Sequence, residues 1–152
     1  MIDIRLANDE DTNFILSSWT RAYAGLNREQ PKWAVFRLQT QIIKGALAMG
    51  DVWVATPEGD TDTIAGWICH VGPVAQFMYV KKPFRGFGVG KKLVEKAGLR
   101  EPIMAAYKAP WMEDRIIYSP QLQHADVLKA FMEDTGNESF SDTVEQRVKA
   151  TS

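Results

Sequence analysis

The sequence has little cysteine, no long apolar run and almost no net charge, and each absence excludes a class of protein. Cys69 is the only cysteine among 152 residues, so no disulfide can form within the chain and no cysteine cluster can hold zinc. No apolar run approaches the roughly 18 residues of a membrane span, and the opening residues lack the apolar core of a signal peptide. We therefore expect a cytoplasmic protein that uses no metal and contacts no membrane.

The charge balance argues against a dedicated nucleic-acid binder. The formal net charge is −1, whereas proteins of that class are usually basic. The length fits one domain over residues 1–152, with no linker, repeat or low-complexity segment. Local charge is different, because residues 81–96 contain six Lys or Arg and one Glu. This basic segment is either a solvated helix face or part of a site for an anion.

The first half of the chain predicts one strand and two amphipathic helices. Residues 2–6 alternate apolar and charged side chains, as a half-buried strand does. One helix follows Asn8, and a second runs from Pro31 to about Met49, where Gly50 ends it. The residues that fall on one face at helical spacing are Phe14, Ile15, Ser18, Trp19, Ala22 and Tyr23 in the first helix and Trp33, Phe36, Thr40, Ile43 and Leu47 in the second.

The second half changes to short apolar runs that predict strands. The expected strands are 51–55, 64–71, 74–80, 103–107 and 115–119, and the expected helices are about 91–97 and 125–134, with a weakly structured tail from 139. The first three of these strands follow one another through short turns and should form an antiparallel meander. The strand at 103–107 follows a helix and should lie parallel to 74–80. The order predicts an α+β fold with a mixed, mostly antiparallel sheet.

A glycine-rich segment, Arg85-Gly-Phe-Gly-Val-Gly90, separates an apolar strand from a helix. This arrangement directs backbone N–H groups and the positive end of a helix dipole toward one point, which suits a phosphate. The glycines are spaced two apart, which matches neither a dinucleotide fingerprint nor a P-loop. A purely structural turn is the alternative interpretation.

The pattern Arg85-x-x-Gly88-x-Gly90, placed between strand and helix, resembles the acyl-CoA-binding motif of the GNAT superfamily of N-acetyltransferases. The resemblance covers roughly residues 1–107 and implies that strands 74–80 and 103–107 splay apart to admit acyl-CoA. It also implies direct acetyl transfer from acetyl-CoA to an unidentified amine, by a monomer or homodimer. The cofactor-binding residues it implies are Tyr79, Val80, Arg85, Gly86, Phe87, Gly88, Val89 and Gly90.

The catalytic groups depart from the family pattern. Where such enzymes often carry a glutamate on the strand before the motif, this sequence has Gln76. The candidate bases are therefore His70, whose intrinsic pKa is suitable, and Asp51, with His124 less well placed. For His70, a structural, hydrogen-bonded histidine is the alternative. Where the family commonly has a tyrosine as general acid, residues 131–132 are Phe and Met. Tyr118 is the candidate acid, and Tyr107 is a substitute for it.

These departures leave two other functions open. The segment 108–122 and the short chain resemble small phage-encoded GNAT-like proteins of the Mom type, which modify DNA bases. The chain would alternatively bind CoA without catalysis, as a regulatory protein. The resemblance places the acceptor near the first two helices, where we expect Trp19 and Trp33 in the core and Tyr23 and Arg28 exposed for recognition. A nucleic-acid partner is not the favoured reading.

Overall fold

The computed structural model describes residues 1–26, 29–107 and 116–134. The predictions for Arg28, for residues 108–115 and for the tail from 139 lie outside this part of the chain. The strands are β1 (Ile2–Leu6), β2 (Asp51–Pro57), β3 (Gly66–Val71), β4 (Val74–Val80), β5 (Ile103–Ala105) and β6 (Ile116–Tyr118). The helices are α1 (Thr12–Leu26), α2 (Lys32–Met49), α3 (Val89–Ala97) and α4 (Ala125–Asp134), with short 3-10 turns η1 (Asp9–Asp11), η2 (Lys82–Phe84) and η4 (Pro120–Gln123).

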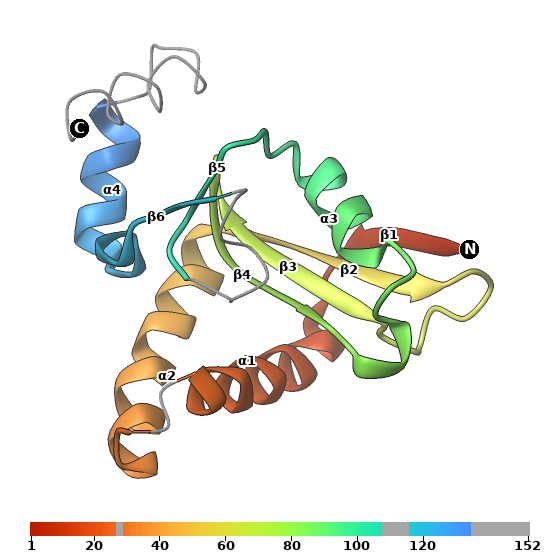
Figure 1. Ribbon diagram of the computed structural model, residues 1–152, viewed down its shortest axis with the longest axis horizontal. Helices are drawn as coiled ribbons and strands as arrows, with labels where there is room; N and C mark the ends of the chain where they lie inside the picture. Colours follow the sequence, from red (N-terminus) through yellow and green to blue (C-terminus); the bar gives the residue numbers. More distant parts are fainter. Residues whose placement is uncertain (27–28, 108–115, 135–152) are drawn as a thin grey trace.

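The strands form one mixed sheet in the order β1-β2-β3-β4-β5-β6. Neighbours from β1 to β4 are antiparallel, whereas β5 runs parallel to β4 and β6 parallel to β5. Helices α1 and α2 lie on one side of the sheet and α3 on the other (Figure 1). The predicted α+β fold with a mixed, mostly antiparallel sheet is confirmed, although β5 ends at Ala105 and is shorter than predicted. Within the described ranges, no helix is long and apolar enough to cross a membrane.

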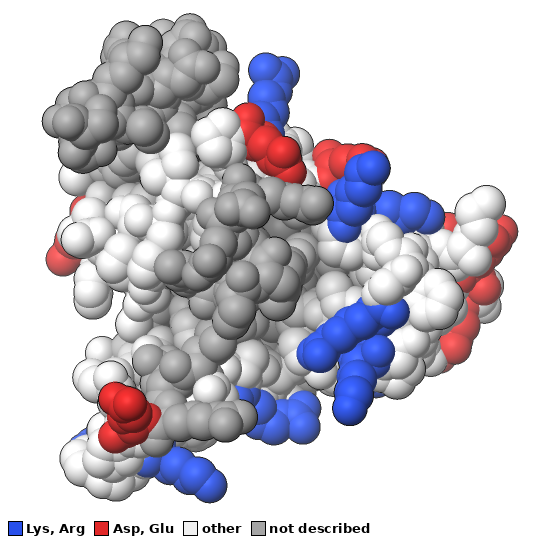
Figure 2. All heavy atoms as spheres, in the orientation of Figure 1, with Lys and Arg blue, Asp and Glu red and all other residues white. Residues whose placement is uncertain are grey.

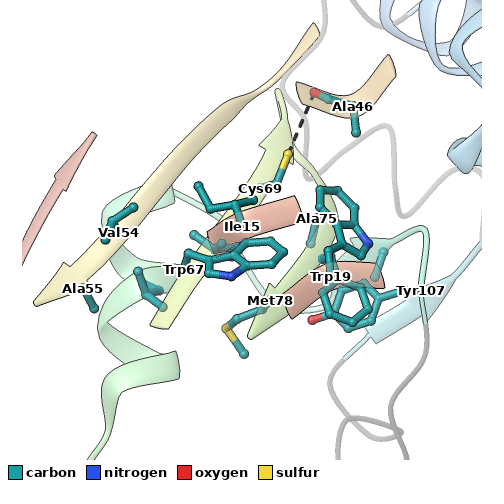
Figure 3. Packing of buried hydrophobic residues seen from close by; sticks show 14 of the residues in the cluster. Ile15, Trp19, Ala46, Val54, Ala55, Trp67, Cys69, Ala75, Met78 and Tyr107 are labelled. Carbon is teal, nitrogen blue, oxygen red and sulfur yellow. Dashed lines mark hydrogen bonds between the residues drawn. The ribbon is translucent and has the colours of Figure 1, made fainter. Parts of the chain in front are cut away.

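Aromatic rings from α1 and the central strands form the main core. Trp19 of α1 packs against Trp67 of β3 and Phe77 of β4, with ring centroids 5.2 and 5.5 Å away (Figure 3). The indole N–H of Trp67 donates to Ser18 Oγ at 2.9 Å, so the core joins α1 to the sheet by a buried hydrogen bond as well as by packing. Trp19 is fully buried, as predicted.

The start of the helical region is fixed by charged and polar side chains. Asn8 accepts the N–H of Glu10 and donates its own N–H to Asp11, which forms a capping box. Arg5 of β1 donates to the Asp11 carboxylate at 2.7 Å. The guanidinium of Arg5 holds the pKa of Asp11 below its ordinary value.

Helix α2 turns only part of the predicted face to the sheet. Ile43 is buried and Leu47 packs against the core, as predicted. Its core residues are Val35, Ile43 and Ala46, whereas Trp33 and Phe36 are 71% and 61% exposed. Trp33 precedes Val35 by two residues, or about 200° of helix rotation, and therefore points away from the core. Tyr23, expected to be exposed, is buried. The prediction that Trp33 is a core residue and Tyr23 an exposed recognition residue was wrong.

Candidate ligand-binding cleft

The strands β4 and β5 are paired only along the first two residues of β4. Val74 faces Met104 and Ala75 faces Ala105, and the last backbone bond runs from Ala106 N to Ala75 O at 2.9 Å. A cleft of about 840 Å³ opens where the two strands part. It is lined by Ser18, Arg21 and Ala22 of α1, Phe77, Met78, Tyr79 and Val80 of β4, Phe84, Arg85, Gly86, Gly88, Val89 and Gly90 of the following turn and helix, and Tyr107 after β5.

A bulge in β4 occurs at the point of separation. Cys69 of β3 faces Phe77, and the next residue, His70, faces Ala75, so Gln76 is the extra residue of the bulge. The extra residue reverses which side of β4 each peptide group faces. The bulge therefore decides which backbone groups the rest of β4 presents to the cleft.

Beyond the bulge, the backbone groups of Met78 and Val80 face the cleft. Lys81 N donates to Ala65 O, on the β3 side, at 2.8 Å. Because peptide groups alternate along an antiparallel pair, those of Val80 and Met78 point the other way. Arg85 confirms this direction, since its Nε donates to Val80 O at 2.8 Å from the turn.

The turn after β4 leaves open space beside two of its glycines. Gly86 and Gly88 have φ values of 87° and 78°, in the left-handed region that glycine adopts without strain. A Cβ on either glycine would meet no atom within 4 Å. Gly90 is different, because a Cβ there would lie 3.1 Å from Met78 Cε. The protein itself does not fill the space next to Gly86 and Gly88.

Helix α3 starts at this turn and supplies hydrogen-bond donors. Lys92 N donates to Gly88 O at 3.1 Å. The N–H groups of residues 89–91 precede this bond and have no acceptor within the helix. They carry the positive end of the helix dipole, and Lys and Arg side chains gather over the segment between β4 and α3 (Figure 2). The turn can therefore hold an anion.

Tyr107 lines the cleft, and its hydroxyl group is buried. The side chain is 3% exposed, packs against Phe77 with centroids 4.7 Å apart, and lies beside Trp19 (Figure 3). Its hydroxyl has no hydrogen-bond partner of normal geometry among the described residues, although the Met78 main chain lies near enough to lower its pKa slightly. Burial raises the pKa of Tyr107 far above its ordinary value, so the hydroxyl stays protonated at neutral pH.

His70, the predicted base, is not among the residues that line the cleft. Trp53 Nε1 donates to His70 Nε2 at 3.1 Å, and His70 Nδ1 lies 2.8 Å from Gly72 O, to which it donates. Because Nε2 accepts a bond and Nδ1 donates one, the imidazole is neutral and both nitrogens are engaged. These bonds are the ones expected of a hydrogen-bonded structural histidine.

Gln76 and Gln123 connect the parting strands to η4. Gln76 is 1% exposed, and its Nε2 donates to Leu122 O at 3.2 Å. Gln123 Nε2 donates to Ala106 O at 2.7 Å, just beyond β5. Both amides are thus used to attach η4 beside the point where β4 and β5 separate.

Of the remaining predicted site residues, most line the cleft and two do not. Tyr118 lies on β6, is 46% exposed and does not line the cleft. Burial raises the pKa of Tyr23 to about 12, and the charge of Tyr118 contributes to this rise. Phe87 is 74% exposed and also lies outside the lining. The other predicted cofactor-binding residues, Tyr79, Val80, Arg85, Gly86, Gly88, Val89 and Gly90, all line the cleft. Tyr107 was only a substitute in the sequence analysis; its position directly after the splayed strand is the signal that favours it.

No protein-family model matches the sequence, and no curated protein matches it. A candidate acetyl transferase from Pyrococcus furiosus is similar in structure, with a TM-score of 0.53 and 17% identity over 91% of this chain and 94% of that one. YjaB from Escherichia coli in its apo form gives a TM-score of 0.48 and 24% identity, over 66% and 68% of the two chains. A GNAT-family acetyltransferase from Staphylococcus aureus Mu50 gives 0.45 and 21%, over 64% and 63%. The chain has the fold of the GNAT superfamily.

Proposed function

We propose that the cleft binds acetyl-CoA and that the protein transfers the acetyl group directly to an amine. The observation that carries this proposal is the coincidence of two features at one place. The sheet opens between β4 and β5, and the open end faces a glycine turn with unpaired helix N–H groups. An elongated ligand with a diphosphate at one end and a narrow arm matches this shape.

Different residues along the cleft would bind the diphosphate and the arm of the ligand. Backbone N–H groups from Gly86 to Lys91 would hold the diphosphate, and the open space beside Gly86 and Gly88 admits its oxygens. The peptide groups of Met78 and Val80 would bond the arm as a neighbouring strand would. Arg85 already bonds Val80 O and so fixes the turn against the end of β4.

Acetyl transfer then needs a neutral amine, a donor for the oxyanion and a proton for the leaving sulfur. The amine attacks the thioester carbonyl, the C–N bond forms and the C–S bond breaks. A cleft-facing N–H of β4 would stabilise the oxyanion. Tyr107, kept protonated by burial, would give its proton to the thiolate and regain one from the attacking nitrogen. Tyr118 is the alternative donor.

No carboxylate or imidazole lines the cleft within the part of the chain that the structure describes. The acceptor would therefore have to lose its ammonium proton to solvent before it attacks. We expect kcat/KM to rise tenfold per pH unit until the pKa of the free amine is reached. A plateau near pH 6–7 with a high-pKa amine would instead reveal a base in the protein.

Calorimetry with CoA and with acetyl-CoA tests the binding step, and release of free thiol with a panel of amines tests transfer. Failure of the protein to bind either compound would reject the proposal altogether. Binding without thiol release would favour the second candidate, a non-catalytic CoA-binding protein. This candidate is supported by the lack of a carboxylate or imidazole among the described residues that line the cleft. Comparison of Tyr107→Phe with Tyr118→Phe separates the two proposed proton donors.

A further inference from the structure

A second groove, of about 1020 Å³, lies between α1 and α2. Most of its lining comes from exposed or half-buried side chains of the two helices, and the buried Val35 forms part of its floor. The lining residues are Asn13, Leu16, Ser17, Thr20, Arg21 and Ala24 of α1 and Lys32, Trp33, Val35, Phe36, Arg37, Thr40 and Lys44 of α2.

The groove combines exposed aromatic rings with cations of one sign. Trp33 and Phe36 are 71% and 61% exposed, which is unusual for side chains of this size. Among the described side chains, the lining holds four cations and no acid, in a chain whose formal net charge is −1. Those cations are Arg21, Lys32, Arg37 and Lys44, and none of them pairs with a carboxylate of the described residues. Charge complementarity points to an anionic occupant.

The geometry favours a narrow, extended occupant. Residues 33, 37, 40 and 44 follow one stripe of α2 that is about 16 Å long, the length of a few nucleotides. Lys and Arg side chains lie below α1 and at the lower end of α2 (Figure 2), with one acidic side chain beyond them at the left. Arg21 also lines the cleft between β4 and β5, so the two sites are adjacent.

We infer that the groove between α1 and α2 binds a single strand of nucleic acid. Bases would stack on Trp33 and Phe36, and phosphates would contact the four cations. An acidic peptide would use the cations but would leave both aromatic rings in water. A membrane surface would need its apolar contacts on one outer plane, whereas these rings line a concavity. The inference does not depend on acetyl transfer.

Fluorescence anisotropy with a labelled dT15 oligonucleotide tests the inference on the full chain. Each phosphate neutralised on a single strand contributes about −0.7 to the slope of log K against log salt. With four cations in the groove, we expect a slope of about −2.8. Absence of binding at low salt would overturn the inference, as would equal binding of a 15-residue polyglutamate or of phosphatidylserine vesicles.

Matched variants locate the site. Trp33→Ala removes an exposed ring, so folding should be retained and dT15 should bind about 5- to 150-fold more weakly. Lys44→Glu should weaken binding and reduce the slope by about 0.7, while Lys129→Glu, an equal charge change on an exposed position of α4, should alter neither. Unchanged binding by Trp33→Ala, or equal losses for both lysine variants, would refute the groove as the site.

Binding of CoA to the same variants separates this inference from the proposed function. We expect Trp33→Ala and Lys44→Glu to bind CoA as the wild type does, since neither residue lines the cleft. Should the wild type bind dT15 through the groove but not CoA, the proposed function fails and the inference stands. Should it bind CoA but not dT15, the inference fails alone.

Discussion

Two glycines with the same backbone conformation allow the cleft to be tested without ambiguity from folding. Gly88, at the start of α3, has φ 78°, and Gly59, in the turn between β2 and β3, has φ 80°. A Cβ added at either position would meet no protein atom within 4 Å. Replacement by alanine should therefore cost both variants the same backbone strain, about 1–2 kcal/mol. For a chain of this length that lowers the melting temperature by about 2–8 °C.

Only Gly88→Ala should also weaken the binding of CoA. Its new methyl group would enter the space in which we place the diphosphate and would push oxygens away from the helix N–H groups. Loss of one hydrogen bond to a charged group corresponds to about 1.5–3 kcal/mol, or roughly 10- to 150-fold in affinity. Gly59→Ala is remote from the cleft and should bind normally.

Calorimetric titration with CoA, together with thermal melts, measures both effects on the same samples. Equal affinity of Gly88→Ala and Gly59→Ala for CoA would refute the placement of the diphosphate. A much larger loss of stability at Gly88 than at Gly59 would refute the assumption of equal strain.

Three other outcomes follow from buried polar groups. Tyr107→Phe removes a buried hydroxyl that lacks a hydrogen-bond partner among the described residues, so the melting temperature should not fall. In the same variant kcat should fall about 10²- to 10⁴-fold while the affinity for CoA is retained. A normal kcat would exclude Tyr107 as the proton donor. Asp11→Asn should lose about 1–3 kcal/mol of stability at pH 7. Arg5 lowers the pKa of Asp11 below its ordinary value of 3.8. The difference in unfolding free energy between the wild type and Asp11→Asn should therefore be complete above pH 3.8 and should vanish as pH falls through the lowered pKa. Denaturant unfolding at several pH values measures it, and a difference that does not change with pH would show that the pair is unimportant. Burial raises the pKa of Cys69 to about 12, so iodoacetamide should label this thiol only after unfolding, and rapid labelling of the native protein, followed by mass spectrometry, would contradict its burial.

The sequence predicted the features that depend on local spacing. The glycine turn, the apolar run of the strand before it and the amphipathic pattern of α3 after it lie within 25 consecutive residues, 74–98. The three short apolar runs that became β2, β3 and β4 follow one another through short turns, and they predicted the antiparallel meander for the same reason. Elements whose identity depends on neighbouring residues were therefore found with nearly correct bounds.

The face of α2 could not be read in the same way. Trp33 and Phe36 are the largest apolar residues of the helix and dominate a pattern based on size. The sheet instead admits the small Ala46, whose carbonyl oxygen lies 3.9 Å from Cys69 Sγ of β3 (Figure 3). A helix that approaches a strand this closely has no room for a large ring at the contact.

The catalytic residues depend on contacts between distant parts of the chain. His70 looks like an available base until Trp53, 17 residues away, is found to occupy its second nitrogen. The bulge at Gln76 is a mismatch between two strands, so neither strand alone reveals it. Tyr107 gains importance only from the separation of β5 from β4. Such properties belong to pairs of residues and leave little trace in the spacing of one sequence.

The two glutamine amides beside η4 have a mechanical consequence. Gln76 and Gln123 attach η4 to β4 and to the residue after β5, beside the point where the two strands part. The gap therefore exists before anything enters it, and no strand pairing has to be broken to make room. A ligand that enters this gap would not have to break strand pairing first, which removes one cost of binding.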